Sequence, residues 1–489
     1  MSTTLSTTLI EADVAILGAG TAGLTARRSA EKAGARAVMI DPGPYGTTCA
    51  RVGCMPSKLL IAAADAAYEM RHADVFGVHA EGVRVDGVAV MARVRRERDR
   101  FVGFVLQATD EHQSEGRLIP GRGRFLDANT VEVTHNDGTI VHVRAKSFVV
   151  ATGSSPFIPP PFRDLGDRLL LNDDVFDWTD LPESLLVVGT GVIGMELGQA
   201  LSRLGVRVTI IGVGGRVGPF DDPRVRAEAT RVFKEELDLH PSYTLHSIER
   251  TDDGVRMRFT DSDGKERDET WSAALMAAGR RPNLQGLELE KAGVALNERG
   301  RPSFDFRTTQ LGGTHVFMAG DVSEHIPLLH EAADEGHIAG ANAARWPGEV
   351  IAGHRRAGLG VVFSDPQMAT AGIRFADLPG GCWNAGEVDY GDQGRARVMN
   401  KNKGIVRVYG NRRDGVLLGA EMFGPRVEHT AHLLAWAIQQ RMTVDQILQM
   451  PFYHPVVEEG IRTALRDLQH NMKFAPAMGN ECEEDGPGT

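Results

Sequence analysis

Apolar runs and helical segments alternate along the chain in a pattern that occurs twice. Residues 14–17 form an apolar run, residues 18–23 are rich in glycine, and an alanine-rich segment of helical periodicity follows. A second apolar run then ends at Asp41. This order predicts a strand, a tight turn, a helix and a second strand, which together form a βαβ unit. The same order recurs over residues 184–212, so we predict an α/β fold with two such units.

The glycines of the first unit are Gly18, Gly20 and Gly23. Glycine at this spacing permits a tight turn and lets backbone N–H groups approach a pyrophosphate at the helix N-terminus. Asp41, which ends the second strand, can accept hydrogen bonds from a ribose. Because strand, turn, helix and acid occur together, we predict a dinucleotide site rather than an ordinary strand–helix turn.

The second unit repeats the glycine spacing, which predicts a second dinucleotide site. Its glycines are Gly189, Gly191 and Gly194. Asp41 stands 21 residues after Gly20, whereas the same count from Gly191 reaches Gly212. The second site lacks the acid of the first, so we expect the two nucleotides to differ.

Other strand-like runs end in residues suited to a ligand. Gly153 and Gly279 follow two such runs and permit the chain to cross close to a bound molecule. Asp321 follows a third run and can accept hydrogen bonds from a polyol or ribose hydroxyl. Taken singly, each is more typical of a turn than of a binding site.

Changes in composition indicate the boundaries of the domains. A proline cluster at 156–161 predicts a stiff connection, and Trp346, Pro347 and Gly348 precede alternating strands and later helices. We expect a first nucleotide domain over 1–155 and 277–348, a second over 156–276, and an α+β domain over 349–472. The polar tail 473–489 is expected to be disordered.

Composition excludes several classes of protein. The 489 residues are 42% hydrophobic with a net charge of −11, which is typical of a folded globular protein and opposes general binding to nucleic acid or an anionic membrane. The sequence has no apolar run of membrane-spanning length, and the first residues lack the pattern of an export signal. We expect a cytoplasmic protein without membrane insertion.

Two of the four cysteines are close together, at Cys49 and Cys54. Cys54 lies just before a predicted helix with Pro56 in its first turn, and the positive end of that helix would stabilise a thiolate. Lys58, four residues on, falls on the same helix face. A zinc site would need four ligands, and Cys382 and Cys482 are isolated, so we favour a redox pair and expect no metal. A structural disulfide is disfavoured because so small a loop adds little stability.

Near the C-terminus, His454 precedes Glu459 by five residues at the start of an amphipathic helix. A carboxylate that orients an imidazole and stabilises its cation would make His454 a general acid–base group, the group that a dithiol needs to become a thiolate. An ordinary surface histidine is the alternative.

Seven segments occur in the order typical of one family. These are GAGTAG, CARVGCMPSK, ATG, GTGVIGMELG, AAGRRPN, AGDV and HPVVEE. The chain thus resembles the pyridine nucleotide–disulfide oxidoreductases over nearly its whole length, and CMPSK is most similar to their dihydrolipoyl dehydrogenase branch. Mercuric reductases, which CMPSK also resembles, normally add a cysteine pair near the end, where only Cys482 stands. The resemblance implies Rossmann-like FAD and NAD(P) domains and a C-terminal dimerisation domain.

The resemblance also implies roles for the candidate residues. Cys49 would exchange with substrate and Cys54 would contact the flavin, while Lys58 would pair with Glu196 near the isoalloxazine. His454 and Glu459 would come from the partner subunit of a homodimer. FAD would be held by Gly18, Gly20, Gly23, Asp41 and Asp321, and the nicotinamide nucleotide by Gly189, Gly191 and Gly194. Gly153 and Gly279 are further cofactor-binding candidates.

We therefore expect a flavoenzyme that oxidises dihydrolipoyl groups, free or on a carrier protein, through a Cys49–Cys54 disulfide and FAD, and passes hydride to NAD. Two alternatives remain: an NADPH-dependent reductase of a low-molecular-weight disulfide, and a docking subunit of a multienzyme complex. The first gains support from Gly212 and from Arg216, which could meet the 2′-phosphate of NADP. Four residues depart from the usual pattern of the family and could alter substrate access. They are Thr47, Arg51, Val456 and Glu458.

Overall fold

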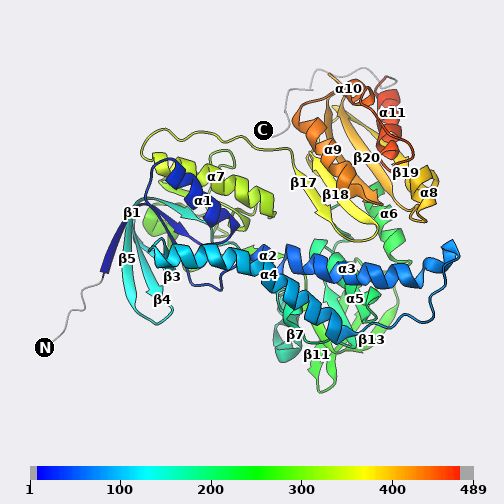
Figure 1. Ribbon diagram of the computed structural model, residues 1–489, viewed down its shortest axis with the longest axis horizontal. Helices are drawn as coiled ribbons and strands as arrows, with labels where there is room; N and C mark the ends of the chain where they lie inside the picture. The colour runs from blue at the N-terminus through cyan, green and yellow to red at the C-terminus, as the bar shows by residue number, and fades with distance from the viewer. Residues whose placement is uncertain (1–7, 474–489) are drawn as a thin grey trace. The chain divides into compact units, whose positions relative to one another are not determined.

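The computed structural model describes residues 8–473, which form two compact units. The first unit contains residues 8–56, 95–157 and 280–355, and the second contains residues 57–94, 158–279 and 356–473 (Figure 1). The finer division into three domains and a tail stays a prediction, and the tail beyond Lys473 lies outside the described residues. Among the described residues, no helix is long and apolar enough to cross a membrane.

A six-stranded sheet is the centre of the first unit. Its strands are β1 (Thr8–Leu17), β2 (Ala37–Asp41), β3 (Leu118–Asp127), β4 (Thr130–His135), β5 (Ile140–Val150) and β16 (Val316–Met318). β1 runs parallel to both β2 and β5, and β4 joins β3 to β5 by antiparallel pairing. The predicted βαβ unit is confirmed as β1, α1 (Thr21–Lys32) and β2.

Helix α1 packs against α7 (Leu329–Arg345) beside this sheet (Figure 1). The two helices approach closely because α7 has glycine at the contact: a Cβ on Gly340 would lie 2.0 Å from the carbonyl oxygen of Ala26. Close packing keeps α1, and with it the glycine-rich turn at its N-terminus, fixed against the sheet. A short antiparallel pair, β6 (Ser154–Pro156) and β15 (Arg280–Pro282), completes this unit.

The second unit contains the second βαβ repeat in a five-stranded parallel sheet of order β10-β9-β8-β14-β7. The repeat consists of β8 (Ser184–Val188), α5 (Val192–Arg203) and β9 (Arg207–Ile211), as predicted. The other strands and helix of this layer are β7 (Leu169–Leu171), β10 (Asp238–His240), β14 (Ala273–Met276) and α6 (Pro223–Phe233). A three-stranded antiparallel sheet follows β10, formed by β11 (Thr244–Thr251), β12 (Gly254–Thr260) and β13 (Glu266–Trp271).

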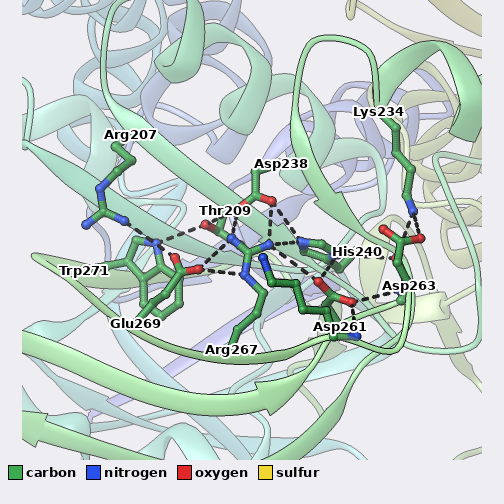
Figure 2. Close-up of polar contacts among 12 residues, drawn as sticks. Arg207, Thr209, Lys234, Asp238, His240, Asp261, Asp263, Arg267, Glu269 and Trp271 are labelled. Carbon is green, nitrogen blue, oxygen red and sulfur yellow. Dashed lines mark hydrogen bonds and ion pairs between the residues drawn. The ribbon is translucent and has the colours of Figure 1, made fainter.

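A polar network ties β10 to this three-stranded sheet, as Figure 2 shows. The guanidinium of Arg267 donates to both carboxylate oxygens of Asp238 at 2.7 and 2.9 Å. Thr209 also donates to Asp238, at 2.7 Å, and accepts from the indole N–H of Trp271. Although burial alone would raise the pKa of Asp238, hydrogen bonds from His240, Arg267 and Thr209 together lower it well below its usual range.

The C-terminal part of the second unit is an antiparallel sheet with helices packed on it, in agreement with the predicted α+β domain. The strands are β17 (Leu359–Val362), β18 (Gln367–Gly372), β19 (Trp383–Asp389), β20 (Ile405–Asn411) and β21 (Leu417–Gly424). Helix α9 (Val427–Gln439) packs on β18 and β21, and α11 (Glu459–Lys473) packs on β19 and β20. Short helices α8 (Gly394–Val398) and α10 (Val444–Leu448) lie in the connections.

Three helices near the N-terminus complete the fold. They are α2 (Thr48–Val52), α3 (Cys54–Arg71) and α4 (Gly87–Ser114). Helices α3 and α4 each contribute residues to both units. The sequence pattern predicts the start of α3, but it did not predict the long helix α4.

Candidate functional site

The first and third glycines of both turns are required by the protein itself. A Cβ on Gly18 would lie 2.2 Å from the carbonyl oxygen of Ala151, and one on Gly189 would lie 2.1 Å from that of Ala277. A Cβ on Gly23 or Gly194 would come within 2.0 or 1.8 Å of the carbonyl oxygen of the first glycine of the same turn. These four glycines let strand, turn and helix pack against one another.

The second glycine of each turn is not required by packing within the protein. Gly20 and Gly191 have φ of −78° and −76°, which any residue adopts, and no atom lies within 4 Å of a Cβ built on either. Each is the N-cap of its helix and offers no side chain to cap the first N–H groups. A helix N-terminus that is open, uncapped and free of side chains fits the pyrophosphate of a dinucleotide.

Asp41 lies at the end of β2, beside the first turn. Its two carboxylate oxygens accept hydrogen bonds from the backbone N–H groups of Ala19 and Gly43, each at 2.7 Å. The side chain therefore shapes the turn, and each oxygen keeps a lone pair for a ribose hydroxyl. The corresponding Gly212 of the second turn donates its N–H to the carbonyl of His240.

Asp321 lies in a hydrogen-bonded chain that the sequence analysis did not predict. Its carboxylate accepts from the hydroxyl of Ser154 at 2.8 Å, and Arg280 Nε donates to the same hydroxyl at 2.8 Å. The buried Glu335 stabilises the turn before Asp321, because its carboxylate accepts a hydrogen bond from the Gly320 N–H at 2.8 Å. Burial raises the pKa of Glu335. Gly153 and Gly279 have φ of 68° and 103°, so backbone conformation alone accounts for both glycines.

Cys49 and Cys54 lie close together where α2 meets α3. Cys54 is the first residue of α3 rather than the residue before it, and it is exposed, whereas Cys49 is half-buried. Gly53 permits the turn between them, because a Cβ there would lie 3.3 Å from the Cα of Cys49. A thiolate at Cys54 would face the positive end of an 18-residue helix.

Two of the residues that depart from the family pattern, Thr47 and Arg51, lie two residues before and two residues after Cys49. Thr47 caps α2 by accepting from the Ala50 N–H, and it does so with φ of 61°, a conformation that favours glycine. The side chain of Arg51 extends along the preceding loop, where Nη1 lies 3.5 Å from the carbonyl oxygen of Pro44.

The ion pair that the resemblance implies between Lys58 and Glu196 is present. Lys58 Nζ lies 2.8 and 2.9 Å from the two oxygens of the buried Glu196 carboxylate. Glu196 also accepts from the Phe363 N–H at 2.8 Å, and the Lys58 ammonium lies 4.7 Å from the centre of the Phe363 ring. The ammonium is thus held in place by a carboxylate and an aromatic face.

His454 and Glu459 are also brought together. His454 Nδ1 lies 3.0 Å from Glu459 Oε2, while Arg462 donates to Glu459 Oε1 at 2.9 Å. Although burial alone would raise the pKa of Glu459, hydrogen bonds from the Val456 N–H and His454, with the charge of Arg462, lower it. The carboxylate is therefore well suited to orient the imidazole and stabilise its cation.

Among the residues from 8 to 473, one cluster has the composition of a metal site, namely His240, Asp261 and Asp263. Figure 2 shows why it does not suit a cation. Lys234 Nζ lies 2.7 Å from Asp263, and Arg267 lies 3.9 Å from Asp261 and in contact with His240. Two basic side chains already neutralise these carboxylates.

Two glycine-rich turns with open helix N-termini, here called the nucleotide cradles, and a cysteine pair at a helix start are the features of a flavin-dependent, nicotinamide-linked disulfide oxidoreductase. Residues 12–336 match the family model of the pyridine nucleotide-disulphide oxidoreductases, and residues 359–465 match the dimerisation domain of that family. The chain belongs to this family. Its members use FAD and NAD, and the cradles at Gly20 and Gly191 fit two such dinucleotides.

Relatives and solved structures match almost the whole chain. A dihydrolipoyl dehydrogenase of Haloferax volcanii is 30% identical over 92% of this chain and 95% of its own length. A mercuric reductase of Streptomyces lividans is 31% identical over 91% of this chain and 93% of its own length. The crystal structure of LpdA from Mycobacterium tuberculosis has a TM-score of 0.78 at 28% identity, covering 94% of this chain and 99% of that one.

Proposed function

We propose that this protein is a dihydrolipoyl dehydrogenase, which oxidises dihydrolipoyl groups and passes the electrons to NAD. The observation that carries the proposal is the similarity over 92% of the chain to several relatives named dihydrolipoyl dehydrogenase. Cys49 is half-buried rather than enclosed, which supports the proposal because a dithiol substrate must reach the thiol that exchanges with it.

In the proposed reaction, Cys49 exchanges with the substrate. A substrate thiolate attacks the sulfur of Cys49 in the Cys49–Cys54 disulfide, and Cys54 leaves as a thiolate stabilised by the N-terminus of α3. The second substrate thiol then displaces Cys49, so the substrate becomes a disulfide and the cysteine pair gains two electrons. Bound FAD would pass these electrons to the nicotinamide nucleotide as hydride.

His454 is the proposed base for the substrate thiols. Deprotonation of a thiol near neutral pH needs a group that takes up one proton, and Glu459 holds the imidazole ready for this role. Lys58, held by Glu196, would place a positive charge where the flavin ring binds.

We further infer that the protein acts as a homodimer in which each subunit supplies His454 to its partner. The matched dimerisation domain supports this, and so does the exposure of His454, whose side chain is 81% exposed in the single chain. Trp436 and Tyr453 are 67% and 79% exposed in the same domain, which is unusual for large aromatic residues unless another molecule covers them. A cytoplasmic location fits a cysteine pair that must cycle through its dithiol form.

A steady-state assay tests the proposal directly. We expect the yellow holoenzyme to oxidise dihydrolipoamide with NAD at a kcat/KM roughly 100-fold or more above its kcat/KM for glutathione disulfide with either NADH or NADPH. Cys54→Ser should bind FAD and have no dithiol activity. A protein that reduces glutathione disulfide with NADPH faster than it oxidises dihydrolipoamide would instead be a low-molecular-weight disulfide reductase, the alternative that the missing acid at Gly212 allows.

A further inference from the structure

The two dinucleotide turns differ in one pair of residues that face each other. In the first turn, the small Ala19 stands between the glycines, and its N–H donates to Asp41 at the end of β2. In the second turn, Thr190 takes the place of Ala19 and Gly212 takes the place of Asp41. A small residue faces an acid in one site, and a larger residue faces a glycine in the other.

Thr190 occupies the space that a side chain at position 212 would need. A Cβ built on Gly212 would lie 2.3 Å from Thr190 Oγ1, 2.7 Å from Cγ2 and 3.0 Å from Cβ. Rotation about χ1 cannot clear this space, because the threonine side chain is branched and its own Cβ is already in contact. The absence of an acid at position 212 is therefore tied to the presence of Thr190.

Thr190 is also fixed in place. Its side chain is buried, its hydroxyl donates to the Arg216 carbonyl at 2.5 Å, and its own carbonyl accepts from the Gly218 N–H at 2.8 Å. These bonds set the path of the loop 212–218, which is also tied to β10 through the bond from Gly212 to His240.

The fixed loop leaves Arg216 without a built phosphate site. Its side chain is 68% exposed, and Nη2 lies 3.7 Å from Asp221, a carboxylate that also pairs with Arg374. A 2′-phosphate at this position would meet neither a repelling carboxylate on the strand end nor a dedicated arginine.

We propose that Thr190 excludes an acidic side chain from position 212, and that without this acid the site accepts NAD(H) and NADP(H) within about tenfold of each other. This inference rests on the proposed function only in placing the nicotinamide nucleotide at the second turn. Thr190 acts only by limiting which residue position 212 can hold, and it takes no part in the chemistry.

The test introduces alanine and aspartate, the residue pair of the first turn, at positions 190 and 212 of the second. In the flavin-loaded enzyme, the dissociation constants of NADH and NADPH, the two kcat/KM values and the melting temperature are measured for Thr190→Ala, Gly212→Asp and the double variant. We expect Gly212→Asp alone to lower the melting temperature and weaken both nucleotides. The double variant should recover the melting temperature and bind NADPH roughly tenfold or more weaker, relative to NADH, than the wild type does. Thr190→Ala alone should leave the NADH-to-NADPH ratio close to that of the wild type.

A matched control separates charge from size. Thr190→Ala with Gly212→Ala relieves the same crowding without a carboxylate, and it should leave the ratio unchanged. A wild type that already discriminates by more than tenfold, or a Gly212→Asp variant that matches the double variant in selectivity and melting temperature, would overturn the role of Thr190. If Gly191→Ala leaves both nucleotides bound as tightly as in the wild type, the assignment of the second turn fails, and the failure is then in the proposed function.

Discussion

Gly20→Ala adds one methyl group at a position where the protein has no atom within 4 Å, so it should weaken flavin binding without damage to the fold. The φ of −78° is allowed for alanine. Alanine restricts the unfolded chain, which stabilises the protein by about 0.4–1 kcal/mol. Alanine is also a poorer N-cap than glycine, at a cost of roughly 0.5–1 kcal/mol. The two effects nearly cancel, and the flavin-free protein should keep its free energy of unfolding.

The loss in FAD affinity follows from what the methyl group displaces. A pyrophosphate held by N–H groups of α1 forms charge-assisted hydrogen bonds, each of which contributes about 1.5–3 kcal/mol. Loss of one such bond weakens binding by about 10- to 150-fold. Gly18→Ala is the contrasting variant, because its Cβ would lie 2.2 Å from the Ala151 carbonyl oxygen at φ of 117°. The left-handed conformation alone costs about 1–2 kcal/mol there, so fold and flavin should be lost together.

The assay measures flavin content after purification, the dissociation constant of FAD for the stripped protein, and melting curves with and without FAD. Gly20→Ala should melt like the wild type without FAD and gain much less from added FAD. A Gly20→Ala protein that retains FAD at wild-type affinity would refute the assignment of this open turn to the flavin. A variant that is unstable even without FAD would show that the space around Gly20 is not free.

Three further predictions address the ion pair, the base and the polar network. Lys58→Met leaves the buried Glu196 carboxylate without its cation, so the free energy of unfolding measured in urea should fall by about 1–3 kcal/mol. The double variant Lys58→Met with Glu196→Gln should largely restore it. An unchanged free energy of unfolding in the single variant would mean that the pair contributes nothing to stability. His454→Gln should slow dithiol oxidation by roughly 100-fold or more while NADH-to-dye transfer through the flavin continues, and equal loss of both rates would indicate misfolding instead. The lowered pKa of Asp238 means that its contribution to stability is complete above the unfolded value of about 3.9 and is lost as the pH falls below it. Asp238→Asn should therefore flatten the acid limb of the stability curve, and an unchanged limb would show that other groups control it.

The sequence by itself determined several features that depend on neighbours within a few residues. Apolar runs bounded by glycine define β1, β2, β8 and β9, because a strand buried under helices needs an unbroken apolar segment. The cysteine pair and the His454–Glu459 pair are each five residues apart, so the chain itself keeps their members near each other. The glycine spacing was also visible, but it did not show that, among the six glycines of the two turns, only Gly20 and Gly191 have no protein atom in the space of a side chain.

Tertiary structure decided the contacts between residues far apart in the chain. Asp321 receives its hydrogen bond from Ser154, and Arg267 reaches Asp238 from another strand. Neither pairing has a local pattern, because it depends on how sheets and helices pack. Gly212 is the clearest case: the sequence shows a missing acid, whereas the structure shows Thr190 filling its place. Local hydrophobic order fixes which elements form, but the space left for a side chain depends on atoms that the fold brings in from elsewhere.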